Sequence, residues 1–219
     1  MKRIFLSLML CGSIAAVNAQ DNSKFEAAMK KNIDQLDSAH AKIMTGDATL
    51  MEAEANAFER IGNAEKDKWQ PYYYAAYAQV MEAMFIKDKD KVDGLADKAT
   101  VNVEKAEAFS PNNSELTCLR SLIAVSRISV DPMTRGAQYG MESATLLEKA
   151  KSQNPENPRV YMMQGQNLYF TPAEFGGDKE KAKELFQLAL QKFASFKPAT
   201  SVDPAWGEAY TKKLLGTMK

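Results

Sequence analysis

One spacing of small and apolar residues occurs three times along the chain and limits the folds that are open to it. In each copy a small residue, a large apolar residue and a second small residue follow one another at intervals of four and then three positions. The copies are Ala99, Val103 and Ala106; Ser143, Leu147 and Ala150; and Ala182, Phe186 and Ala189. Such intervals place the side chains on one face of a helix. The sequence therefore predicts three helices that each present the same kind of packing face.

A second predicted helix precedes each copy and carries a small residue of its own: Ala76, Ser121 and Gly165. Two antiparallel helices approach closely only where the side chains between them are small. The predicted crossing points are Ala76 with Ala99, Ser121 with Ser143, and Gly165 with Ala182. The large residue of each copy then fills the space between one helix pair and the next.

Together with Tyr72, Thr117 and Tyr161 at the first large position, this pattern resembles the tetratricopeptide repeat. The resemblance implies an all-α fold: a short right-handed α-solenoid of antiparallel helix pairs, with repeats at about 69–111, 114–155 and 158–196. The match is partial, because each unit has an insertion between its helices, at 85–94, 129–140 and 171–177. A helical bundle unrelated to that family is the alternative.

The remaining segments also read as helices, and β-branched residues are sparse. A degenerate pair is predicted over 24–66, as helices 24–44 and 50–65. A closing helix is predicted over 204–216, with Trp206 and Tyr210 packed back on the repeats. This gives about nine helices in a single domain over 20–219. Apolar residues make up 45% of the chain, enough for an ordinary core.

Residues 1–19 are typical of a cleaved export signal. Lys2 and Arg3 precede an apolar stretch that ends in a small-residue site, and cleavage is predicted after Ala19. The stretch is shorter than the ~20 apolar residues that span a bilayer. A lipid anchor on Cys11 is the alternative, although Leu10 stands where lipoprotein signals have a small residue. The mature protein is expected in the periplasm or outside the cell, without membrane insertion.

The sequence lacks the residues that nucleic-acid binding, metal binding and catalysis require. The net charge of the whole chain is +0, so no basic field for nucleic acid is expected. His40 is the single histidine, and Cys118 is the one cysteine left after cleavage, expected as a small buried residue. The segment 88–94 resembles a calcium loop superficially, but Val92 and Ala99 occupy positions that need oxygen ligands. No catalytic motif, metal site or cofactor site is predicted, and the chain is not expected to be an enzyme.

The resemblance implies that the first helix of each pair lines a concave groove. The groove residues are Gln70, Tyr73, Tyr77, Glu115, Cys118, Leu122, Arg159, Met162, Gln166 and Tyr169. Tyrosines, amides and one arginine suit an extended peptide, because tyrosine gives a large contact area at low entropic cost. The predicted function is therefore a protein-binding or peptide-binding scaffold for a partner of unknown identity. Phe175, between a proline and two glycines, is a possible loop contact.

Two alternatives remain open at the level of sequence. Tyr73, Tyr77 and Leu122 could be buried beneath insertions that fold into the groove. The insertions could also cap an apolar pocket around Tyr73, Leu122 and Met162, which would suit an accessory protein that carries a small ligand during solute uptake. An enclosed pocket favours the carrier, and an open groove favours the peptide scaffold.

Overall fold

The protein is all-helical over the residues that the computed structural model describes, which are 8–43, 47 and 49–218. This part of the chain forms nine α-helices and two short 3-10 helices, and it contains no strand. The α-helices are α1 (Leu8–Ile43), α2 (Thr49–Ala64), α3 (Gln70–Phe85), α4 (Val92–Phe109), α5 (Ser114–Ile128), α6 (Pro132–Gln153), α7 (Pro158–Phe170), α8 (Lys179–Ser195) and α9 (Glu208–Thr217). The 3-10 helices are η1 (Lys89–Lys91) and η2 (Ala173–Phe175).

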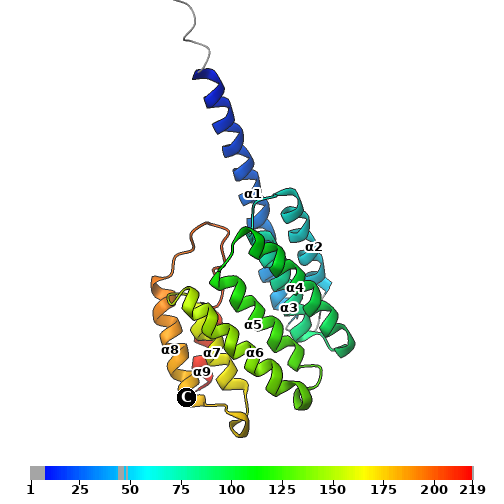
Figure 1. Cartoon of the computed structure of the whole chain (residues 1–219), viewed down its shortest axis with the longest axis vertical. Coiled ribbons are helices and arrows are strands. Elements are labelled where there is room, and N and C mark those ends of the chain that lie inside the picture. The colour runs from blue at the N-terminus through cyan, green and yellow to red at the C-terminus, as the bar shows by residue number, and fades with distance from the viewer. Residues whose placement is uncertain (1–7, 44–46, 48, 219) are drawn as a thin grey trace, which may run out of the picture.

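Consecutive helices pack against each other as α1 with α2, α3 with α4, α5 with α6, and α7 with α8 (Figure 1). The first helices also contact one another in the order α1, α3, α5 and α7. We call the side of the molecule that these four helices form the inner face. The helix α9 packs on α8 and ends the chain.

The predicted crossing points are where the paired helices touch. The hydroxyls of Ser121 and Ser143 are 2.7 Å apart and buried. A Cβ atom built on Gly165 would lie 3.2 Å from the carbonyl oxygen of Ala182, closer than most real side chains approach. Ala76 and Ala99 are fully buried on the adjacent helices α3 and α4. Small side chains therefore set the close approach within each pair, as the sequence predicts.

Side-chain caps begin several helices where the sequence expects them. The Asn157 side chain accepts from the amide of Arg159 at the start of α7, and Asp131 caps α6 in the same way. Pro158 and Pro132 follow these caps at positions that need no amide donor. Asp203 and Pro204 form the same kind of pair at the predicted start of the closing helix, but this start is wrong, because α9 begins only at Glu208.

Buried and partly buried polar groups join one helix pair to the next. Glu59 of α2 accepts hydrogen bonds from Gln79 of α3 (3.0 Å) and from Asn102 of α4 (2.7 Å). Arg120 of α5 forms a two-pronged bond to Glu107 of α4, with both distances at 2.7 Å. These bonds fix the orientation of neighbouring pairs in addition to the apolar packing.

The helix α1 runs continuously through the predicted cleavage site after Ala19, while residues 1–7 lie outside the described part of the chain. Its N-terminal portion projects beyond the other helices in Figure 1. Packing of α1 on the core begins at Phe25 and Met29, both buried. Removal of 1–19 would therefore leave these packing contacts in place. Within the described residues, no helix has both the length and the apolar character needed to span a bilayer.

Candidate ligand-binding face

A segment without regular structure crosses the inner face between α8 and α9. We call residues 196–207 the strap. Val202 of the strap is buried, and the Asp203 carboxylate accepts a hydrogen bond of 2.9 Å from the side-chain amide of Gln70 on α3. The strap also reaches α1, where the hydroxyl of Ser201 donates to Glu26 at 2.9 Å.

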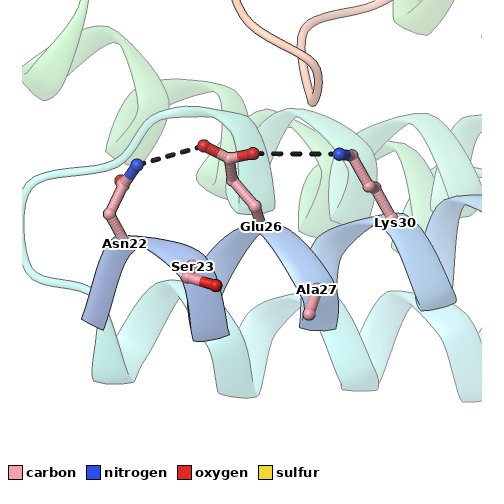
Figure 2. Close-up of a pocket in the computed structure, with 5 residues that line it drawn as sticks. All are labelled: Asn22, Ser23, Glu26, Ala27 and Lys30. Carbon is pink, nitrogen blue, oxygen red and sulfur yellow. Dashed lines mark hydrogen bonds and ion pairs between the residues drawn. The ribbon is translucent and has the colours of Figure 1, made fainter. Parts of the chain in front are cut away.

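Glu26 belongs to a small polar group on α1 (Figure 2). Its carboxylate accepts from the side-chain amide of Asn22 at 3.0 Å and faces the ammonium of Lys30 at 3.8 Å. An open hollow lies over these side chains, with Ser23 and Ala27 beside them. Because the hollow is polar and shallow, it contributes an attachment point for the strap rather than a pocket for an apolar ligand.

Arg159 of α7 is the central anchor of the strap, and its side chain is completely buried. Its guanidinium forms a two-pronged ion pair with Glu115 of α5, at 2.6 and 2.7 Å. It also donates to the carbonyl oxygens of Pro204 (2.9 Å) and Trp206 (2.8 Å) in the strap. Burial disfavours the charged form, but the Glu115 carboxylate outweighs it and raises the pKa of Arg159. The guanidinium therefore remains charged and pairs two helices with the strap.

Aromatic rings complete the cover over this part of the inner face. The Phe196 ring lies 4.7 Å from the Arg159 guanidinium, and the Trp206 ring lies 5.6 Å from it. The indole nitrogen of Trp206 donates to the hydroxyl of Tyr73 at 2.9 Å, and its ring lies 4.9 Å from that of Tyr77. Burial raises the pKa of both tyrosines, so they remain neutral.

The side chains at the predicted groove positions are mostly buried, which does not favour the open groove that the sequence left as one alternative. The buried ones are Gln70, Tyr73, Tyr77, Cys118, Leu122, Arg159 and Met162. Glu115, Gln166 and Tyr169 are partly buried. The strap contacts Gln70, Tyr73, Tyr77 and Arg159, and Glu115 pairs with Arg159. Cys118 is a free, buried thiol, as expected.

The inner face also includes residues that form no described hydrogen bond with the strap. We call seven of them the open half: Asp37, His40, Tyr77, Met81, Leu122, Gln166 and Tyr210. Tyr77, Met81 and Leu122 are buried, whereas Tyr210 of α9 is 42% exposed. Burial is the main cause of the raised pKa of Tyr77, and Asp37 of α1 and Tyr210 raise it further, so these three side chains lie in one region. Tyr210 is the most accessible tyrosine of the open half.

His40 is the one side chain of the open half that could ligate a metal ion through nitrogen. It is half-buried, with its ring centre 6.4 Å from that of Phe85. Burial lowers the pKa of His40, although Asp37 opposes this shift. No group of three or more His, Cys, Asp or Glu residues suited to a metal ion occurs among the described residues.

Phe175 projects from the loop 171–177 with 68% of its surface exposed, so its side chain does not anchor the loop by packing on the helices. The loop is held in one shape by its glycines. Gly176 has a φ of +93°, and a Cβ on Gly177 would meet the Thr171 carbonyl oxygen at 1.8 Å. An open hollow adjoins this loop and the first residues of α8. Neither of these two open hollows is the enclosed apolar pocket around Tyr73, Leu122 and Met162 that the sequence left as an alternative.

The described part of the chain is thus an all-helical protein whose inner face is partly covered by the strap. No protein-family model and no curated protein matched the chain. Among solved structures, it is similar to the HusA haemophore from Porphyromonas gingivalis, with 33% sequence identity and a TM-score of 0.72. The alignment covers 85% of this chain and 92% of that one. The chain belongs to the family of this haemophore, and the resemblance to the tetratricopeptide repeat has no independent confirmation.

Proposed function

We propose that the protein is an exported, non-enzymatic carrier that binds haem or a related tetrapyrrole on the open half of its inner face. The observation that carries the proposal is the likeness to a haemophore over 92% of that chain's length. It supports the small-ligand alternative from the sequence over the peptide scaffold. Export rests on the predicted signal at 1–19, and delivery to an uptake system is the role that suits such a carrier.

The chemistry of the open half suits a flat and largely apolar ligand. A tetrapyrrole macrocycle gains most from aromatic and thioether contacts, and Tyr210 offers an exposed ring here, while the buried Tyr77, Met81 and Leu122 provide the apolar packing around it. Polar groups stand at the border, in the exposed Asp37 and the half-buried His40, where solvent can reach the polar edge of a ligand. We place the ligand against Tyr210 because it is the most exposed aromatic residue of this surface.

The finer description of the fold belongs to the same proposal. The order of contacts among α1, α3, α5 and α7 supports a short solenoid of helix pairs, similar to tetratricopeptide repeats. In such a solenoid the inner face is the concave one. Peptide binding at the predicted groove residues would require the strap to leave Arg159 and Tyr73, and for this reason we prefer the small ligand.

Titration of the mature protein with haem tests the proposal, followed by haem absorbance and by quenching of tyrosine and tryptophan fluorescence. Tyr210→Ala should weaken binding about tenfold, because it removes the most exposed ring of the open half. Phe109→Ala is the matched control, since Phe109 is also 42% exposed but lies at the end of α4. Equal affinities for the wild-type protein and both variants would place the ligand elsewhere, and the absence of binding would refute the carrier.

A further inference from the structure

Exposed apolar side chains gather along one edge of the molecule, where the helices of three pairs are connected. Figure 1 shows the α3–α4, α5–α6 and α7–α8 connections following one another along the lower edge. Phe85 ends α3, Met133 lies in the first turn of α6, Phe170 ends α7, and Phe175 lies in the next loop. Their exposed fractions are 37%, 83%, 61% and 68%. We call these four residues the apolar rim.

The rim is held in position by the structure around it. Asp93, at the start of α4, pairs with Arg127 at the end of α5 (3.2 Å) and with Arg135 in the first turns of α6 (2.8 Å). In the third connection, the amide of Gly177 donates to the Pro172 carbonyl oxygen at 3.1 Å. The exposed side chains therefore project from fixed supports. Large exposed apolar side chains that share one edge of a molecule mark an interaction surface, since the fold gains nothing from exposing them.

The charges beside the rim indicate what it contacts. Lysine and aspartate alternate over 87–91, and lysine and glutamate alternate over 179–181, so neither sign dominates. A strongly charged partner would find no complementary field here. Single apolar side chains on separate connections offer a protein little continuous surface, whereas each of them can enter a fluid lipid interface by itself.

We propose that the apolar rim inserts into the surface of a phospholipid bilayer with zwitterionic headgroups, while the helices remain outside. None of the described helices could span a membrane, so the contact is peripheral. The proposal does not require the carrier function. If both hold, ligand exchange occurs close to the bilayer, because Phe85 of the rim packs on His40 of the open half.

Sedimentation of the mature protein with phosphatidylcholine vesicles tests this inference. The wild-type protein should sediment with the vesicles, and binding should change less than about twofold between low and high salt, since charge contributes little. Met133→Ser combined with Phe175→Ser should lower the partition coefficient at least about tenfold, the equivalent of about 1.4 kcal/mol. Val101→Ser combined with Phe109→Ser is the matched control, because both residues are exposed on α4 and lie outside the rim.

Three results would overturn the inference: no sedimentation of the wild-type protein, an equal loss in the control, or binding that appears only with anionic lipid. Self-association is a further outcome that contradicts it. If the wild-type protein dimerises in lipid-free buffer and the rim variant does not, the rim contacts a second copy instead. Haem titration of the rim variant without vesicles separates the two proposals. Unchanged haem affinity with lost vesicle binding supports both, whereas vesicle binding without haem binding refutes only the carrier.

Discussion

The two halves of the inner face are built on the same four helices, to which the strap is added in one half and α9 in the other. In the strapped half, the buried Arg159 pairs with Glu115 and donates to the strap, and the Trp206 ring lies beside it. In the open half, Tyr77, Met81 and Leu122 are also buried, but Tyr210 remains 42% exposed. The comparison shows that a groove expected from a repeat pattern can be divided by a segment that follows the helix pairs. One half stabilises the fold, and the other is where we propose that a ligand binds.

The largest expected effect is that of Arg159→Ala. It leaves Glu115 buried without its partner and frees the carbonyl groups of Pro204 and Trp206, at a cost of about 3–5 kcal/mol. Thermal unfolding should show a decrease of about 10 °C in Tm. Arg120→Ala is the control, because Arg120 also donates two hydrogen bonds to a carboxylate, that of Glu107, but its side chain is 27% exposed. Its expected cost is about 1 kcal/mol or less. Equal losses would mean that the strapped half has no special role in stability.

Gly207→Ala should have the next largest effect. Gly207 ends the strap with a φ of +115°, and a Cβ there would lie 2.7 Å from the Phe193 ring. Strain of this kind costs about 1–3 kcal/mol. Denaturant unfolding measures the change, with Gly216→Ala as the control, because a Cβ on Gly216 meets open space. An unchanged midpoint for Gly207→Ala would show that the strap tolerates another path.

Tyr73→Phe tests the hydrogen bond that Trp206 of the strap donates to Tyr73 of α3. The substitution removes the acceptor of the Trp206 indole nitrogen and should cost about 1 kcal/mol. Tyr210→Phe, in the open half, should cost less, because solvent reaches that hydroxyl. Urea titrations of the two variants compare the halves directly. A larger loss for Tyr210→Phe would reverse the assignment of the two regions.

Glu82→Gln should have the smallest effect on the stability of the fold. Glu82 contrasts with Glu115, which is paired with an arginine. Burial, and then Glu52, raise the pKa of Glu82, and one of its carboxylate oxygens is buried without a hydrogen-bond partner. A carboxyl whose pKa is raised by folding destabilises the native state once it ionises. The variant should therefore be more stable at pH 7, and this gain should disappear as the pH falls below about 4. Thermal unfolding across pH 3–8 checks this, and a gain that persists in acid would contradict it.

The sequence predicted the helix pairs well because their determinants are local and periodic. Gly165 against Ala182 and Ser121 against Ser143 are contacts that follow from spacing alone. The Asp203–Pro204 pair led to a wrong start for the last helix, because the same residues that cap a helix also suit a turn. Asp203 instead accepts hydrogen bonds from Thr200 and Gln70, and Pro204 presents its carbonyl to Arg159.

The strap and the ligand could not be derived from the sequence. Arg159 and Glu115 were both assigned to the groove, but their pairing depends on the contact between α5 and α7, which are 44 positions apart at these residues. Trp206 was expected to pack back on the repeats, without any indication of which residues it would cover. The proposed tetrapyrrole binding has no sequence motif, since the proposed surface takes one or two residues from each of five helices.

The position of the strap after all four helix pairs also determines when folding can be completed. Until residues 196–207 have been synthesised, the strap contacts of Tyr73, Tyr77 and Arg159 cannot form. The earlier helix pairs can assemble before that, because their contacts are local. A product that stops before the strap would expose these rings together, and it would depend on chaperones or be degraded.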